Sequence, residues 1–127
     1  GFAGAAADAM ALFEKFEVKL NEVNGNLQKA VVEMAKDWRT DKILKELDAL
    51  LAIMGSKSAF LLSGSGDVIE PDDNVISIGS GSGYAVASAR SYIDAGEKEP
   101  STIVKKALQI TADLCIYTNN NITVLKA

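Results

Sequence analysis

Helix-forming sequence dominates the first 51 residues and constrains the fold more than any other feature. Apolar residues recur there at spacings of three and four, which predicts one amphipathic helix over residues 5 to 23 and a second from Leu27 as far as Leu51. The two stripes consist of Met10, Phe13, Phe16, Leu20 and Val23, and of Leu27, Val31, Met34, Trp38, Ile43, Leu44, Leu47 and Leu51. The intervening Asn24-Gly25-Asn26 tolerates the positive φ of a helix stop. A connection this short implies an antiparallel helical hairpin.

The remaining sequence contains little β character for so much helix. Short strands are predicted over residues 52–54, 59–62 and 75–78, and the end of the chain, from Ile116–Thr118 through residues 122–125, is predicted to return to β character. Two further helices are predicted, one from about Tyr84 to Asp94 and one that Ser101 caps. Each helical hairpin needs a sheet beneath its apolar face. We therefore expect a single α/β domain over residues 1–127 whose sheet is completed by an absent segment or by a partner chain.

Composition excludes several kinds of catalytic and binding site. The chain has no histidine, so Ser-His-Asp catalysis and imidazole zinc sites are excluded. Its single cysteine, Cys115, excludes an intrachain disulfide and is expected to be a buried, inert thiol. The net charge of −4 argues against a dedicated nucleic-acid binder. No apolar run reaches the roughly 18 residues of a membrane span, so we expect a cytoplasmic protein without a membrane partner.

Gly79-Ser80-Gly81-Ser82-Gly83 is the most conspicuous motif. It follows a predicted strand and opens a predicted helix, where backbone N–H groups could hold an anion or a nucleotide. Its third glycine comes one residue too early for the dinucleotide pattern. Two other interpretations stay open: a tight turn with close backbone approach, and serine hydroxyls that orient a catalytic group. The mixed charges between Asp37 and Asp48 predict a solvated helix face or a subunit interface.

Several segments, in this order, are similar to the HslV (ClpQ) family of peptidase subunits of the HslUV protease. The similarity covers essentially the whole chain. The segments are Gly1-Phe2-Ala3-Gly4, Ala7-Asp8-Ala9, Ala35-Lys36-Asp37-Trp38-Arg39-Thr40-Asp41, Leu50-Leu51-Ala52, Gly66-Asp67-Val68, Ile78-Gly79-Ser80-Gly81 and Cys115-Ile116-Tyr117-Thr118-Asn119.

The resemblance implies an N-terminal-nucleophile hydrolase with a proteasome-β-like, four-layer αββα sandwich. In that family an N-terminal threonine attacks the peptide carbonyl, and its own α-amino group and a nearby lysine handle the proton. This chemistry needs no histidine. The family's threonine and lysine precede the segment that matches Gly1. We therefore expect the chain to be the C-terminal portion of a threonine peptidase subunit, without its first strands and inactive alone.

The resemblance also assigns roles to residues of this chain. Ser80 matches a serine that orients the terminal amine, and Gly1 matches a glycine whose backbone N–H contributes to the oxyanion hole. The edge that pairs with substrate backbone comprises Gly1, Phe2, Ala3, Gly4 and Ala5. A sodium ion is held by backbone carbonyls, which here belong to Ala112, Cys115 and Thr118.

The partners implied are an HslU-type AAA+ ATPase, which uses the ATP, unfolded protein substrates, and further copies of the subunit in two hexameric rings. Two other functions remain as alternatives. One is a ring-forming subunit without catalysis. The other is an unrelated anion- or nucleotide-binding domain that uses Gly79–Gly83.

Overall fold

The computed structural model describes residues 1–126, which fall into two compact units, Gly1–Asn74 and the residues from Val75 onward. Each unit is described by itself. The expectation of a single domain stays a prediction. The first unit contains β1 (Phe2–Ala3), α1 (Ala6–Glu22), α2 (Leu27–Thr40), the short 3-10 helix η1 (Leu44–Glu46), β2 (Leu50–Met54), β3 (Ala59–Ser63) and β4 (Val68–Ile69). The second contains α3 (Ser82–Asp94) and α4 (Pro100–Leu114).

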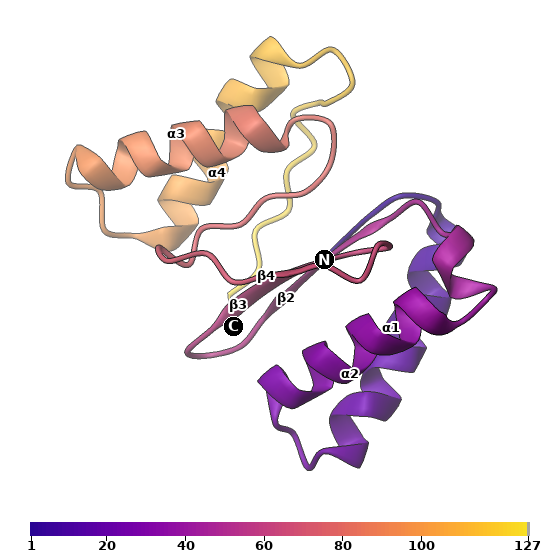
Figure 1. Ribbon diagram of the computed structural model, residues 1–127. Coiled ribbons are helices and arrows are strands. Elements are labelled where there is room, and N and C mark those ends of the chain that lie inside the picture. Colours follow the sequence, from indigo (N-terminus) through magenta and orange to yellow (C-terminus); the bar gives the residue numbers. More distant parts are fainter. Residues whose placement is uncertain (127) are drawn as a thin grey trace. The chain divides into compact units, whose positions relative to one another are not determined.

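The first unit is an antiparallel sheet with the order β1-β2-β3-β4. Leu51 of β2 pairs with Phe2 of β1 on one side and with Leu62 of β3 on the other. Leu51, Ile53, Phe60 and Leu62 are all buried in one cluster with residues of α1 and α2. Figure 1 shows the two helices side by side over one face of the strands. The hairpin therefore covers one face of the sheet, as two amphipathic helices are expected to do.

The turn between α1 and α2 forms as the sequence predicted. Asn24 and Gly25 adopt positive φ values of 53° and 78° and end α1. The side chain of Asn26 then accepts a hydrogen bond from the backbone N–H of Lys29 at 3.0 Å and caps α2. Three consecutive residues thus supply the stop, the reversal and the new start, which confirms the helical hairpin.

The predicted stripe of α1 is only partly correct. Leu12, which lies outside that stripe, is completely buried, whereas Met10 and Phe13 are 63% and 61% exposed. Phe16 packs against the core as expected. Spacings of three and four fit both faces, because Leu12 and Phe16 are also four residues apart. The sheet selects the face with Leu12.

The prediction that α2 extends to Leu51 is wrong. Asp41 takes an extended conformation, and its carboxylate accepts hydrogen bonds from the N–H groups of Ile43 (2.8 Å) and Leu44 (3.1 Å). These two donors would otherwise bond to helix carbonyls. The chain then makes the short turn η1 and enters β2 at Leu50.

The second unit is built on the pair α3 and α4, with a small core of Ala89, Ile103 and Ala107. Figure 1 shows these helices in contact along part of their length. The expected N-cap at Ser101 is wrong, because α4 begins one residue earlier with Pro100 at its first position and Glu99 as its cap. Proline suits that position because a first-turn N–H has no helical partner. Ser101 instead donates its hydroxyl to Glu99 at 2.6 Å.

Two predicted strands of the second unit do not form. Residues 75–78 and 122–125 lie outside any strand. Apolar alternation alone does not make a strand, because the ladder requires a neighbouring strand in register. The C-terminal segment instead returns to α4, where Ile122 and Val124 line a shallow groove with residues near the start of that helix. Lys126 forms an ion pair with Glu99 at 3.4 Å.

Candidate functional site

The glycine turn before α3 presents Ser80 to solvent. Gly79 has a φ of +98°, a conformation that residues with side chains rarely adopt. The Ser82 N–H donates to the Gly79 carbonyl at 3.1 Å, and the Ala85 N–H donates to the Gly81 carbonyl at 3.0 Å. Ser80 is exposed and Gly81 is buried. The turn therefore holds a serine hydroxyl at the start of a helix, on a backbone fixed from both sides.

A second turn forms where α4 ends. The Thr111 carbonyl accepts hydrogen bonds from the Cys115 N–H at 2.8 Å and from the Thr118 hydroxyl at 3.1 Å. The Thr118 hydroxyl also lies 2.7 Å from the Cys115 carbonyl, which it can reach as a donor. Cys115 is buried, as expected. Backbone carbonyls are thus gathered at the C-terminal end of α4, where the helix dipole is negative.

Gly81 brings these two turns into contact. A Cβ on Gly81 would overlap Thr111 Cγ2 and would lie 3.1 Å from Thr118 Cγ2. The structure therefore brings the Ser80 turn together with the turn that contains Cys115 and Thr118. The close approach favours the interpretation of the motif as a tight turn, since Gly81 faces threonine methyl groups. Sequence reasoning missed Thr111, and its only signal was a position four residues after Ala107, on the face of the helix that the structure buries.

The predicted substrate edge lies in the other unit. β1 is an outer strand of the sheet and pairs only with β2 among the described strands. Phe2 and Ala3 form this strand, whereas Gly4, at a φ of +145°, leaves it towards α1. The Gly1 nitrogen donates to the Ala52 carbonyl at 2.6 Å, and the Ala52 N–H donates to the Gly1 carbonyl at 2.9 Å.

The predicted site residues therefore divide between the two units. Ser80 and the proposed cation ligands Ala112, Cys115 and Thr118 belong to the second unit, and Gly1 to Ala5 belong to the first. The edge position of β1 is compatible with pairing to an extended peptide. The oxyanion role of Gly1 stays a prediction, and in this structure its nitrogen is already bonded to the sheet.

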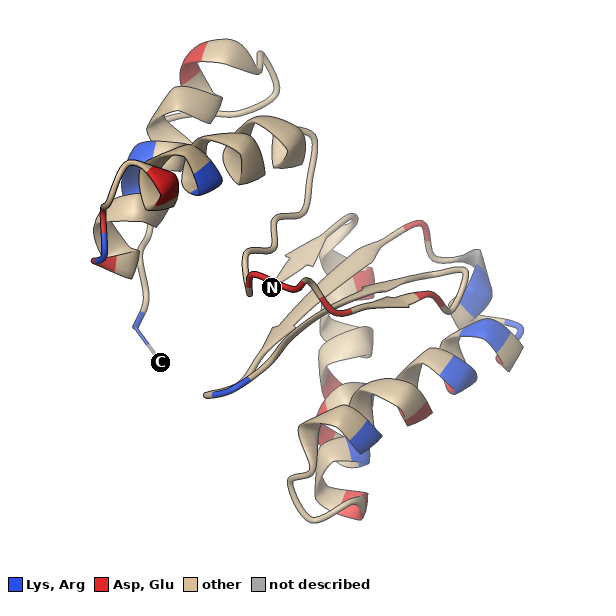
Figure 2. Ribbon diagram, turned by 60° about the vertical axis from the view of Figure 1, so that its left-hand side comes forward, with Lys and Arg blue, Asp and Glu red and all other residues tan. Residues whose placement is uncertain are grey.

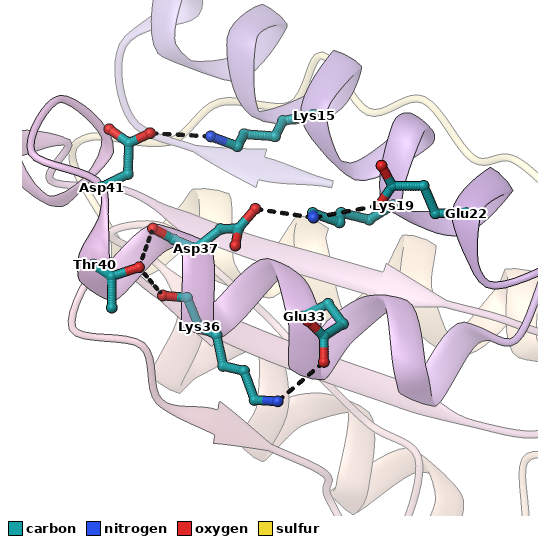
Figure 3. A network of polar contacts seen from close by, with 8 residues as sticks. All are labelled: Lys15, Lys19, Glu22, Glu33, Lys36, Asp37, Thr40 and Asp41. Atoms are coloured by element: carbon teal, nitrogen blue, oxygen red, sulfur yellow. Dashed lines mark hydrogen bonds and ion pairs between the residues drawn. The ribbon is translucent and has the colours of Figure 1, made fainter.

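Two residues of the charged run predicted as a solvated helix face or a subunit interface, Asp37 and Asp41, form ion pairs with α1, whereas Arg39, Lys42, Lys45 and Asp48 are exposed. Lys15 of α1 pairs with Asp41 at 3.1 Å, and Lys19 pairs with Asp37 of α2 at 3.2 Å and with Glu22 at 3.3 Å (Figure 3). The hydrogen bonds that Lys19 donates to the carboxylates of Asp37 and Glu22 raise its pKa. Figure 2 shows basic and acidic residues interspersed along both helices. The pairs between the helices are only partly exposed, and each joins a residue of α1 to Asp37 or Asp41. Ion pairs that water still reaches each add little stability.

Asp41 is the exception, because it also organises the chain after α2. Its pKa is lowered, first by the N–H groups of Leu44 and Ile43 and then by Lys15. A carboxylate whose pKa falls on folding stabilises the fold above its unfolded pKa, and this stabilisation is lost as the pH falls through the folded pKa. We expect Asp41→Asn to lower the unfolding midpoint at pH 7, with the difference from wild type shrinking below about pH 4.

Thermal unfolding between pH 3 and pH 7 measures this effect. Asp72→Asn, on an exposed turn, is the matched control and should follow wild type throughout. If the difference between the Asp41→Asn and wild-type unfolding midpoints stays the same from pH 3 to pH 7, the charge of the Asp41 carboxylate does not contribute to stability.

Comparison with known proteins places this geometry in a family. Residues 1–127 match the family described as proteasome subunit. The chain is 59% identical to the ATP-dependent protease subunit HslV of Caldicellulosiruptor saccharolyticus, over 99% of this chain and 72% of the relative. It is 54% identical to that of Pseudothermotoga lettingae, over 98% and 70%. The crystal structure of eukaryotic HslV from Trypanosoma brucei superposes with a TM-score of 0.89 at 40% identity, over 94% and 70%.

The chain therefore belongs to the proteasome subunit family, and its fold is the proteasome-like, N-terminal-nucleophile hydrolase fold. Within that family it is a subunit of the HslV type. These findings confirm the resemblance and the fold class. Among the described residues, no helix has the length and apolar character needed to cross a membrane.

Proposed function

We propose that this chain belongs to the peptidase subunit of an ATP-dependent protease and that the subunit hydrolyses peptide bonds of unfolded proteins. The observation that carries the proposal is the similarity to HslV subunits over nearly the whole chain, together with the Ser80 turn held against the end of α4. Gly1 cannot act as a hydroxyl nucleophile. The proposal therefore places the nucleophilic threonine outside these 127 residues.

In this mechanism the threonine hydroxyl attacks the peptide carbonyl, and the threonine α-amino group accepts its proton. Ser80 has a role that its position supports: an exposed hydroxyl on a rigid turn can hydrogen-bond to that amine and hold it in place. β1 would align an extended substrate by backbone hydrogen bonds at its free edge. The mechanism needs no histidine, and the chain has none.

The test uses the protein as its gene encodes it. Its intact mass and N-terminal sequence establish whether a threonine is the first residue. We expect that protein to hydrolyse small peptide amides and to be stimulated when an HslU-type ATPase and ATP are added. An intact gene product without a terminal threonine would overturn the proposal and would favour the alternative of a ring-forming subunit that lacks catalysis.

Self-assembly and compartment belong to the same proposal. We expect two hexameric rings that enclose the active sites, in the cytoplasm. Native mass spectrometry of the intact protein measures the assembly. A dodecamer that does not hydrolyse peptides would again favour the non-catalytic subunit, whereas a monomer would contradict both.

A monovalent cation, usually sodium in this family, is proposed at the end of α4. The carbonyls of Ala112, Cys115 and Thr118 are oxygen donors of the kind that hard cations prefer, and the helix terminus adds negative potential. The Thr118 hydroxyl has one proton and lies within reach of both the Thr111 and the Cys115 carbonyls, so donation to Thr111 leaves the Cys115 carbonyl able to bind an ion. When bound, the ion would neutralise this end of the helix and stiffen the turn.

We expect peptide hydrolysis to fall several-fold when sodium chloride is replaced by choline chloride at equal ionic strength, because choline is too large for a ring of carbonyls. A third measurement in potassium chloride distinguishes a requirement for sodium from a requirement for any small monovalent cation. Equal rates in all three salts would remove the cation from the proposal.

A further inference from the structure

Thr111 is a buried polar residue whose groups all have defined partners. Its side chain is 2% exposed, and its hydroxyl donates to the Ala107 carbonyl within α4 at 2.8 Å. Its carbonyl accepts from the Cys115 N–H and from the Thr118 hydroxyl. With the polar groups satisfied in this way, the Cγ2 methyl group is the part of the side chain that faces Gly81.

The contact at Gly81 fixes one side of the glycine turn. Gly81 is buried at the cap position of α3, and it leaves no room for a Cβ against the methyl groups of Thr111 and Thr118. On the other side of Ser80, the Gly79 carbonyl accepts a hydrogen bond from the Ser82 N–H. Ser80 therefore stands between two fixed residues. A methyl group removed from Thr111 leaves a void beside Gly81, into which the backbone that carries Ser80 can move.

We propose that Thr111 is a positioning residue for the Ser80 hydroxyl, acting through the contact between its Cγ2 methyl group and Gly81. The inference rests on the proposed function, because it assigns Ser80 the role of orienting the nucleophile's amine. Thr111 touches neither substrate nor reacting atoms. The methyl group determines the position of Ser80, while the hydroxyl of Thr111 hydrogen-bonds only within α4.

Two substitutions separate these groups in the intact protein with its own N-terminus. Thr111→Ser keeps the hydroxyl and removes the methyl group, whereas Thr111→Val keeps a methyl group in that place and removes the hydroxyl. We expect Thr111→Ser to lower kcat for a small peptide amide about tenfold with little change in KM, because a displacement well under 1 Å is enough for such a loss. Thr111→Val should stay within about twofold of wild type, since the bond that it loses is an intrahelical one.

A double-mutant cycle with Ser80→Ala tests whether Thr111 acts through Ser80. In the Ser80→Ala background, Thr111→Ser should cause no further loss of kcat, since the hydroxyl that it positions is gone. Hydrogen exchange gives a readout without catalysis: Thr111→Ser should speed exchange at the amides of Ser82 and Ala85, which close the glycine turn, and Thr111→Val should not.

The outcomes distinguish this inference from the proposed function. A wild-type protein without hydrolysis overturns the proposed function, and the hydrogen-exchange comparison then still tests the contact. If the wild type is active, three results would overturn the inference. Thr111→Ser could have the same kcat as wild type, or Thr111→Val could lose as much kcat as Thr111→Ser. The third result is that Thr111→Ser still lowers kcat in the Ser80→Ala background.

Discussion

Gly81→Ala is expected to lower peptide hydrolysis by the intact protein about 100-fold and to destabilise it by about 1–3 kcal/mol. The added Cβ would overlap the Thr111 methyl group and press on that of Thr118. Overpacking of a filled site costs energy of this order, and a shift of about 1 Å in a catalytic group costs about this much rate. The backbone at Gly81 is not left-handed, with a φ of −90°, so the effect is one of space and not of backbone strain.

Gly83→Ala is the matched control, because it lies two residues further on and a Cβ there meets nothing within 4 Å. It should leave hydrolysis unchanged and should not destabilise α3, since alanine is the better helix former. Peptide hydrolysis and thermal unfolding of both variants measure the difference. If Gly81→Ala has the same rate of hydrolysis and the same thermal stability as Gly83→Ala, then Gly81 does not pack against α4.

A second substitution can restore the space that Gly81→Ala consumes. Thr111→Ser removes the methyl group with which the new Cβ would overlap. We therefore expect Gly81→Ala/Thr111→Ser to recover part of the stability that Gly81→Ala loses, although Thr111→Ser destabilises the protein by itself. Coupling of this kind is expected for residues in contact and is absent between distant, independent sites.

Local sequence predicted the elements that depend on neighbouring residues. The hairpin of α1 and α2 followed from periodicity and from the Asn24–Asn26 turn, where the residues supply their own conformational preference. The same method failed after Asp41. The apolar spacing continues there, but the Asp41 carboxylate captures the N–H groups that a helix would need, and Leu50 and Leu51 pair with other strands. Periodicity records which residues are apolar and not which partner will bury them.

The candidate site depended on resemblance and on tertiary contact. Ser80 was identified because its motif matches a family, since a serine among glycines has several interpretations by spacing alone. Thr111 could not be found in that way. Its importance arises from the approach of Gly81, which comes from a distant part of the chain, and no local pattern encodes such an approach.

Leu12→Ala is expected to cost the intact protein about 3–5 kcal/mol of unfolding free energy, the range typical of a fully buried leucine that leaves a cavity. Leu12 of α1 is completely buried in one cluster with residues of α2, β2 and β3. Its neighbour Phe13 is 61% exposed, although the sequence placed it on the apolar stripe. Phe13→Ala is therefore the matched control, and it should change stability by no more than about 0.5–1 kcal/mol.

Denaturant unfolding at one fixed protein concentration compares the two variants, since assembly adds a concentration-dependent contribution to stability. The expected order follows from the sheet, which determines the buried face of α1. The reverse order, with Phe13→Ala more damaging than Leu12→Ala, would mean that the face with Met10 and Phe13 carries the packing in the intact protein. In that case the face predicted by the stripe, and not the face packed on β2 and β3, would stabilise the subunit.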